Sequence, residues 1–483
     1  MHWFSAPDQW LSRLAIQRGL ALCYLLAFLN ALNQFRPLLG ENGLLPAPRY
    51  LGLTGFRVAP SLFHWRYSDR LLAVVAWTGI VLAVCEMATL PERAPLVVSM
   101  LVWLAMWALY MSIVNVGQVF YGFGWESLLL EAGFLATFLG NLDTAPPVIV
   151  LWLFRWLLFR VEFGAGLIKM RGDRCWRRLT CLDYHHETQP MPNPLSWWFH
   201  RLPRPLHRVE VLGNHVAQLG APLLLFTPQP FAEIGAAAMA LTQAWLVLSG
   251  NFAWLNLVTI VLAFSAIGDS WLHRVLPLSP PAHLGAPGPA WFVAVVLLMA
   301  ALIVFLSWWP ARNMVSRGQS MNASFNPLHL VNTYGAFGSV TKVRHEVVIE
   351  GTASPLPAGG AEWREYEFKG KPGDPGRRPP QVAPYHLRLD WLMWFAALSP
   401  GYARSWMLPL LQRLLDGDRA TLKLLRRNPF PDEPPRHVRA LLYRYRFTTW
   451  RERRQSGTWW SRQLVGEYVS AELSSLSRDR SRR

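Results

Sequence analysis

Three charged residues recur along one apolar stretch of the sequence. Arg155, Glu162 and Lys169 are spaced at seven-residue intervals within a run that is long and apolar enough to span a bilayer. At 3.6 residues per turn, this spacing keeps the three side chains on one face of a helix. Because charge that faces lipid is costly, we expect this face to point into the protein. The stripe then serves either as an ion-pair network that fixes helix packing or as a substrate or proton site.

Further charges nearby offer partners for this stripe. Arg160 lies on the same run, and Glu126 and Glu131 lie on the apolar segment before it. Buried charges are usually paired, because removing one partner leaves an uncompensated charge. We therefore predict hydrogen-bond contact between one arginine of the run and one glutamate, drawn from Arg155 or Arg160 and from Glu126, Glu131 or Glu162.

Two cysteines, Cys175 and Cys181, share the loop that follows the run. Their spacing is not the C-x-x-C of redox motifs, so a structural role is favoured over a catalytic one. If the loop turns back on an oxidising face of the membrane, the two can form a disulfide. Otherwise they remain free structural thiols.

Residues with metal-binding side chains come next in this loop: Asp183, His185, His186 and Glu187. Adjacent histidines point in different directions in a helix or a strand, so hydrogen-bonded ordering of the loop is favoured over a metal site. The sequence contains no nucleophile elbow, Walker loop, zincin helix or Rossmann fingerprint. We therefore expect no metal and no cofactor, and a non-enzymatic role is favoured.

The hydrophobic runs of the sequence predict the helices that position these residues. Of the 483 residues, 52% are hydrophobic, and they gather in runs close to the length that crosses a bilayer as a helix. These runs predict a polytopic α-helical membrane bundle of six to nine spans. The clear runs are residues 14–32, 72–90, 96–114, 147–168, 231–249 and 291–309, and the weaker ones are 127–140, 209–227 and 252–267.

The net charge of +17 comes largely from basic residues beside these runs. Such residues typically reflect membrane topology and contact with anionic lipid headgroups, so we expect membrane lipids as partners and no nucleic acid. Nine spans would place the C-terminal region in the cytoplasm, and losing one weak span would place it on the opposite side. Arginine far outnumbers lysine, which is typical of a GC-rich genome and favours a bacterial source.

The membrane-like character ends near residue 310. We predict a multi-pass membrane domain over residues 1–310, with long loops at 33–71 and 169–208, and a soluble, extra-membrane α+β domain over 311–483. Within that domain, alternation predicts strands at 343–352, 363–370 and 437–449, and apolar spacing predicts helices at 387–398, 405–415, 421–427 and 458–469.

Several long strings in the sequence closely resemble the lipase maturation factor family. These strings are WESLLLEAGFL, LIKMRGDRCWRRLTCLDYHHETQPMPNPLSWW, LSGNFAWLNLVTIVLAF, LVNTYGAFGSVTK, and EYEFKGKPGDPGRR with PYHLRLDWLMWFAAL. The resemblance covers nearly the whole chain. It implies a multi-pass membrane protein that assists the maturation of secreted lipases, in the endoplasmic reticulum membrane of eukaryotes or the inner membrane of bacteria.

The resemblance also implies that the C-terminal domain contacts a secreted, lipase-like client. Because Trp, Tyr and Arg dominate binding energy at protein interfaces, the candidate client anchors are Trp363, Tyr366, Arg377 and Arg378. The alternative is that the tryptophans of this domain, above all Trp391 and Trp394, form its own core.

The family further resembles, at a distance, the membrane domain of vitamin K-dependent carboxylases, which are enzymes. A second function therefore stays open, that of a membrane enzyme acting on a lipid-soluble or membrane-proximal substrate through residues 126–187. A transporter ranks last, because no inverted repeat is visible. An open cavity with unpaired acid or histidine groups would favour the enzyme, and a closed, fully paired network the maturation factor.

Overall fold

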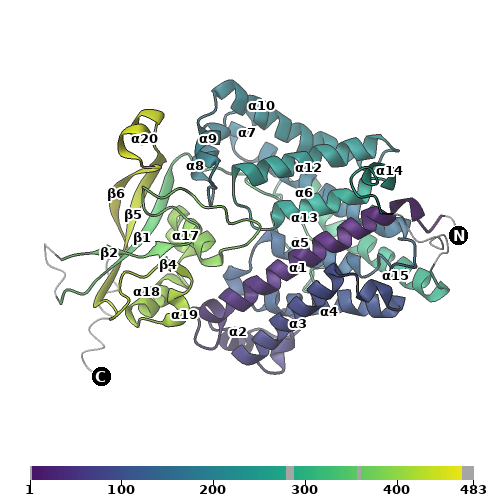
Figure 1. The fold of residues 1–483 in the computed structure, drawn as a ribbon, viewed down its shortest axis with the longest axis horizontal. Coiled ribbons are helices and arrows are strands. Elements are labelled where there is room, and N and C mark those ends of the chain that lie inside the picture. The colour runs from purple at the N-terminus through teal and green to yellow at the C-terminus, as the bar shows by residue number, and fades with distance from the viewer. Residues whose placement is uncertain (1–2, 279–287, 356–360, 470–483) are drawn as a thin grey trace.

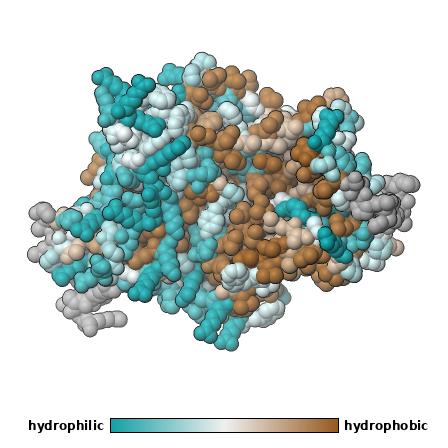
Figure 2. Space-filling model, viewed as in Figure 1, coloured by the Kyte–Doolittle hydropathy of each residue, from teal (hydrophilic) through white to brown (hydrophobic). Residues whose placement is uncertain are grey.

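The computed structural model describes residues 3–278, 288–355 and 361–469. The fold has a helical half and a half built on β-sheet, with helix α17 (Arg388–Leu398) between them (Figure 1). On the face shown in Figure 2, apolar side chains gather over the helical half and hydrophilic ones over the sheet half. This separation is what a protein needs when only one half of it lies in lipid.

In the described part of the chain, five helices are long and apolar enough to cross a membrane. Each coincides with a clear hydrophobic run of the sequence, so the polytopic membrane fold is confirmed. They are α1 (Trp10–Leu39), α3 (Asp69–Met87), α4 (Leu96–Asn115), α12 (Phe231–Ser249) and α15 (Ala290–Leu306), the last continued by α16 (Trp308–Val315).

A sixth clear run forms α6 (Val148–Arg171), which is 24 residues long. It carries more charge than the other five helices, but its charged side chains Arg155, Arg160, Glu162 and Lys169 are all buried. Because the helix has the length to span and buries these four charges, it is a further candidate span beside the five.

The weaker runs form shorter helices in and around the bundle. Thirteen-residue α5 (Gly124–Ala136) is too short to span a bilayer, and almost all of its residues are buried. The other weak runs form α10 (Arg204–His215), a π-helical turn (Val216–Gly220), α11 (Ala221–Leu224) and α13 (Leu255–Ala263). The connections carry α2 (Ala47–Leu53), α7 (Arg174–Arg177), α8 (Leu182–Thr188), α9 (Ser196–His200) and α14 (Asp269–Leu272).

The C-terminal part contains a four-stranded antiparallel sheet in the order β2-β1-β5-β6. The strands are β1 (Arg344–Thr352), β2 (Arg364–Glu365), β5 (His437–Phe447) and β6 (Trp460–Val469). A second sheet pairs β3 (Glu367–Phe368) with β4 (Leu425–Arg427). The helices of this part are α17, α18 (Met407–Leu415), α19 (Arg419–Leu422) and α20 (Trp450–Ser456).

The prediction of a helix over residues 458–469 is wrong, because this segment is strand β6. Helix α20 ends at Gly457, whose φ of 70° lies in the left-handed region that glycine adopts at helix ends. The chain therefore turns back and pairs β6 with β5 along its length. The tertiary pairing overrides the local helical pattern. The predicted strands at 343–352 and 437–449 and the helices at 387–398 and 405–415 are confirmed. The strand predicted at 363–370 is divided into two short strands, β2 and β3. The helix predicted at 421–427 is wrong, because α19 ends at Leu422 and Leu425–Arg427 form β4.

The predicted boundary at residue 310 lies inside the stretch formed by α15 and α16. Beyond residue 320, the described ranges contain no helix of spanning length. The next segment returns to the bundle before the sheet begins, since Gly164 of α6 packs against the backbone of Tyr334. The two halves therefore share an interlocked interior.

Candidate functional site

One buried carboxylate, Glu131 of α5, is saturated with hydrogen bonds. It forms an ion pair with Arg160 of α6, and both side chains are at most 1% exposed. Asn332 donates to it through its backbone N at 3.0 Å and Nδ2 at 2.9 Å, and Tyr334 OH donates at 2.8 Å. Arg160 Nη1 donates in turn to the backbone O of Asn332 at 2.6 Å. The predicted arginine–glutamate contact is present, and it also holds the returning segment in place.

The other glutamate of α5, Glu126, takes a partner from the C-terminal part. Arg388 Nη1 donates to Glu126 Oε1 at 2.7 Å, and Tyr110 OH also donates to this carboxylate. Arg388 Nε donates to Asn30 Oδ1 of α1 at 2.7 Å, and Nη1 also donates to the backbone O of Phe120 at 2.8 Å. This arrangement joins α1, α4, α5 and α17 at one buried point.

Arg155 takes no part in either network. Its Nε donates to the backbone O of Ser265 at 3.0 Å, and its Nη1 lies 3.4 Å from the backbone O of Leu225. Its guanidinium lies 4.9 Å from the ring centroid of Trp152. No carboxylate of the described residues lies within 4.0 Å of it. The predicted stripe is therefore not one network, because Arg155 is held by carbonyl groups apart from Glu162 and Lys169.

Glu162 and Lys169, the other two members of the stripe, are joined through amide side chains. Gln218 Nε2 donates to Glu162 Oε2 at 3.1 Å, and Gln243 Nε2 donates to Glu162 Oε1 at 2.7 Å. Lys169 Nζ donates to Gln218 Oε1 at 2.7 Å and lies 3.5 Å from Asn214 Oδ1. Both charged groups are buried. Gln218, in the π-helical turn, thus holds the acid and the base apart while it contacts both.

These two charges line a cavity of about 860 Å³. Its walls come from α6, α8, α10, α12, α13 and α17 and from residues 334–339, and most of the lining is apolar. The volume lies within the usual range for small-molecule sites of about 300–1,000 Å³. The charges of α5 are therefore enclosed and paired, whereas those at the end of α6 border open space.

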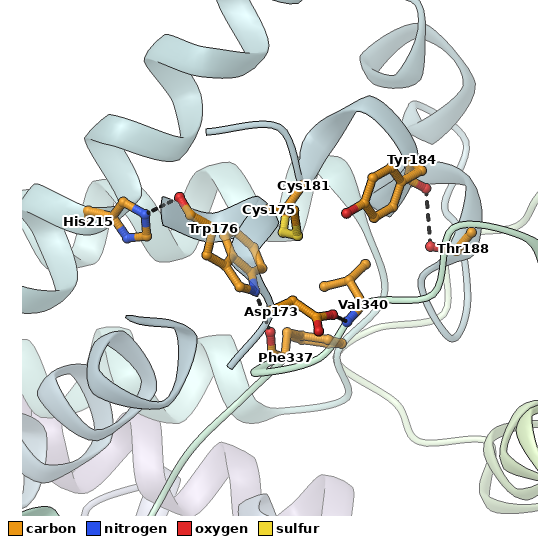
Figure 3. The surroundings of a disulfide bond; sticks show 9 residues. All are labelled: Asp173, Cys175, Trp176, Cys181, Tyr184, Thr188, His215, Phe337 and Val340. Carbon is orange, nitrogen blue, oxygen red and sulfur yellow. Dashed lines mark hydrogen bonds between the residues drawn. A yellow bond between two sulfur atoms is a disulfide. The ribbon is translucent and has the colours of Figure 1, made fainter. Parts of the chain in front are cut away.

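The loop after α6 is fixed by the disulfide between Cys175 and Cys181, whose Cα atoms are 4.8 Å apart (Figure 3). On either side of it, Asp173 Oδ2 accepts from the backbone N of Val340 at 2.7 Å, and Trp176 Nε1 donates to the backbone O of Phe337 at 2.8 Å. Of the two alternatives left open by the sequence, the structure has the disulfide. It anchors the loop against the returning segment.

The metal-type residues of the loop point to separate partners. Asp183 Oδ1 lies 3.5 Å from His207 Nδ1, and His186 Nε2 lies 3.6 Å from Glu210 Oε2. Glu187 Oε2 accepts from the backbone N of Phe447 at 2.7 Å and lies 3.6 Å from His200 Nε2. Among the described residues, no group of three or more His, Cys, Asp or Glu side chains could hold a metal ion.

Burial shifts the pKa values of three side chains in and beside this loop. It lowers the pKa of His185 to about 3 and that of His200 to about 3, so both rings are neutral at physiological pH. Burial also raises the pKa of Glu187, against the lowering effect of its bond from the backbone of Phe447. The loop therefore presents uncharged rings to the cavity and the sheet.

The predicted client anchors are not brought together. Trp363 is half-buried beneath the guanidinium of Arg439, which lies 3.9 Å from its ring centroid. Tyr366 is buried in the sheet domain. Arg377 Nη1 donates to the backbone O of Phe368 at 2.7 Å, so it supports a turn.

Trp391 and Trp394 fit the alternative of a core role. Trp391 is 3% exposed and packs at 4.9 Å, centroid to centroid, against Trp125 at the start of α5. Trp394 Nε1 donates to the backbone O of Thr188 on α8 at 3.1 Å. Both residues therefore fasten α17 to the bundle and its loop.

Arg378 belongs to an aromatic and cationic surface that the sequence did not reveal. Its guanidinium lies 5.0 Å from the ring centroid of Trp198 and 5.4 Å from that of Trp459. Arg453 lies 3.4 Å from the ring centroid of Trp459. We call the tryptophan–arginine cluster the set Trp197, Trp198, Arg378, Trp450, Arg453 and Trp459. It joins α9 of the membrane half to α20 and β6.

These elements define an integral, multi-pass membrane protein whose interior charges are satisfied partly by a docked extra-membrane sheet domain. Two family models match the chain, one described as the lipase maturation factor transmembrane domain over residues 11–274 and one as the lipase maturation factor C-terminal domain over 330–470. The chain belongs to the lipase maturation factor family.

Curated relatives agree with both matches. Lipase maturation factor 1 of Bos taurus is 43% identical, covering 95% of this chain and 88% of that protein. Lipase maturation factor 1 of Homo sapiens is 42% identical, covering 98% of this chain and 90% of that protein. Lipase maturation factor 2 of Rattus norvegicus is 30% identical, covering 93% of this chain and 81% of that protein. No solved structure matches the chain.

Proposed function

We propose that this protein is a membrane-embedded maturation factor that helps a secreted, lipase-like client reach its active fold. One observation carries the proposal: relatives named lipase maturation factor 1 are 42 to 43% identical over at least 95% of this chain. The likeness therefore includes the membrane helices, the disulfide loop and the sheet domain together. The membrane is the inner membrane if the source is bacterial and the endoplasmic reticulum membrane if it is eukaryotic, with anionic lipid headgroups beside the basic loops.

The C-terminal part, residues 311–483, carries much of the client contact in this proposal, and the tryptophan–arginine cluster is its centre. Trp450 of the cluster is 51% exposed, and Arg378 is exposed beside it. Trp and Arg are the residues most enriched among energetically dominant interface positions. Trp363 offers a second contact at the other end of the sheet. Buried Tyr366 and the turn-supporting Arg377 act by holding this surface in shape.

A membrane enzyme stays a second candidate, and one observation favours it. Glu162, Lys169 and His186 line an open cavity, whereas Glu126 and Glu131 lie in closed, paired networks. Catalysis, in this alternative, uses the cavity and leaves the α5 networks as structural supports.

The test uses cells that lack the gene and a secreted lipase as the reporter. Full-length protein is needed, because a chain ending at residue 312 would leave Glu126 without Arg388 and Glu131 without Asn332. Arg378→Glu and Trp450→Ala should each lower secreted lipase activity several-fold at unchanged levels of membrane-inserted protein. Arg454→Glu, exposed on the same helix as Trp450, is the matched control and should restore full activity.

Two results would count against this function. If both cluster variants restore full lipase activity, the client contact lies elsewhere. If loss of the gene changes no secreted protein, the maturation role fails and the membrane enzyme becomes the leading candidate.

A further inference from the structure

Lys169 carries a buried charge that the described residues do not neutralise. No Asp or Glu oxygen of these residues lies within 4.0 Å of Nζ. An ammonium has three donors, and Nζ has one close acceptor, Gln218 Oε1 at 2.7 Å, and a distant one, Asn214 Oδ1 at 3.5 Å. A charge that is 95% removed from solvent in a membrane protein is expected to meet an opposite charge. The ammonium therefore has capacity for an anion.

Glu162 does not supply this anion at close range. Both of its oxygens already accept from side-chain amides, those of Gln218 and Gln243. Gln218 stands between the two charges and contacts each. The pair is thus arranged so that the carboxylate is satisfied within the protein and the ammonium faces the cavity.

Other polar atoms beside the cavity lack partners in the described structure. His186 is 2% exposed; its Nε2 lies 3.6 Å from Glu210 Oε2, and its Nδ1 has no hydrogen-bond partner among the described residues. Asn256 is also 2% exposed and lines the cavity, and its Oδ1 has no such partner. Buried polar atoms are nearly always hydrogen-bonded. His186 Nδ1 and Asn256 Oδ1 therefore leave capacity for polar groups of a ligand in the cavity.

The rest of the cavity is suited to a hydrocarbon chain. Leu206 and Val209 of α10 and Leu241 of α12 line it and are more than half exposed on their own helices. Because α12 is long and apolar enough to span a membrane, its exposed side chains face lipid. Trp245 Nε1 of α12 donates to Glu210 Oε1 of α10 at 2.7 Å, so the two helices lie side by side (Figure 1). A chain in the bilayer thus has an apolar path toward Lys169 beside these helices.

We propose that this cavity binds a single-chain anionic amphiphile. Its hydrocarbon chain lies among the apolar side chains of α10, α12 and α13, and its carboxylate or phosphate head lies at Lys169. The proposal stands apart from client maturation, because it concerns a lipid-facing cavity and not the tryptophan–arginine cluster.

The experiment uses full-length protein in phosphatidylcholine nanodiscs and a diazirine-bearing oleate as the probe. After illumination, the labelled peptides are identified by mass spectrometry. Label should appear on the cavity segments of α10, α12 or α13, and unlabelled oleate should compete for it. Oleyl alcohol, which has the same chain without charge, and octanoate, which has the charge on a short chain, should each compete at least tenfold more weakly.

The source of the negative charge is tested by a further competitor. Oleoyl lysophosphatidate carries a phosphate head on the same chain, so its potency relative to oleate shows which head the site prefers. Either order supports an anionic amphiphile. Equal competition by oleyl alcohol would overturn the proposal, as would label that falls outside the cavity.

Two variants and a control complete the design. Lys169→Gln should reduce labelling at least tenfold, whereas Arg171→Gln, an arginine with an exposed hydrogen bond at the end of the same helix, should leave it unchanged. Ala165→Leu adds bulk to the cavity wall while Lys169 itself is kept, and should reduce labelling even if the lysine variant folds poorly. Labelling of both variants at the wild-type level would show that the amphiphile does not bind there.

Discussion

Arg388 Nη1 lies 2.7 Å from Glu126 Oε1 although 262 residues separate them, and both side chains are at most 1% exposed. Helix α17, which follows strands β1 to β3 of the C-terminal part, therefore supplies the counter-charge of a helix inside the membrane half. This single contact makes the stability of each half depend on the other.

Breaking that pair should be costly. Arg388→Met should destabilise the protein by about 3–5 kcal/mol, because Glu126 would keep its charge without a cationic partner. The double variant Arg388→Met with Glu126→Gln should recover part of this loss. Thermal unfolding of purified protein and protease sensitivity of the sheet domain measure the effect. An unchanged melting temperature for Arg388→Met would contradict the coupling of the two halves.

The two arginines of α6 should differ in their importance. Arg160→Met leaves Glu131 charged and buried, and should cost about 3–5 kcal/mol. Arg155→Met removes bonds to carbonyl groups only and should cost about 1–3 kcal/mol, the usual range for an unsatisfied buried acceptor. Expression level and thermal stability of the two variants, compared side by side, check the order. If Arg155→Met lowers thermal stability more than Arg160→Met does, our assignment of Arg160 and Glu131 as the structural ion pair is wrong.

The disulfide should be structural. Cys175 and Cys181 are six positions apart, and closing so short a loop is worth about 2 kcal/mol by the chain-entropy relation. The double variant Cys175→Ser, Cys181→Ser should therefore melt earlier but retain activity on the client at permissive temperature. Normal folding with complete loss of client maturation would instead indicate a catalytic role for the thiols.

The same bond predicts the sidedness of the protein. Disulfides persist in oxidising compartments, so the loop should lie on the extracytoplasmic or lumenal face. The sheet domain should lie on that face too, because the backbone N of Phe447 donates to Glu187 of the loop at 2.7 Å. Maleimide labelling of intact membranes should reach the two loop thiols only after reduction. A C-terminal reporter active in the cytoplasm would refute this orientation.

Acid should weaken the loop through His185. Its folded pKa of about 3 lies below the usual value near 6.5, so the unfolded state takes up the proton first as pH falls. The contribution of this ring to the free energy of unfolding is therefore fully present above about pH 6.5. It falls by about 1.4 kcal/mol per pH unit as the pH drops from there toward 3. The melting temperature of His185→Asn should change less between pH 7 and 5 than that of the wild type. Equal slopes for the two proteins would rule out this origin.

Hydrophobic runs located the membrane helices correctly, because length and apolarity are local properties of the chain. The buried face of α6 was also predictable, since charge cannot face lipid. The role of Arg388 was not, because its partner Glu126 is distant in sequence and its neighbours read as an ordinary apolar helix. A buried arginine inside LRLDWLMW was nevertheless a signal that a counter-charge was needed.

The tryptophan–arginine cluster and strand β6 were missed for a related reason. Trp198 and Trp459 meet only after α9 and the sheet have docked, and no local spacing records that encounter. Likewise, the segment after Gly457 is a strand because β5 offers it an edge for pairing. These features depend on contacts between segments that are distant in the sequence, and patterns within a short window of sequence do not reveal such contacts.

The pairing of Glu126 with Arg388 also sets a time order for synthesis. Glu126 enters the membrane with α5, whereas its partner is still 262 residues short of being translated. At about 5–20 residues per second, the ribosome needs roughly 13–52 s to deliver it. Throughout that interval the carboxyl group of Glu126 lacks its arginine partner, so we expect the insertion machinery to hold the nascent bundle until Arg388 emerges. Premature stop codons before Arg388 should therefore send the protein to membrane quality control even when every spanning helix has been made.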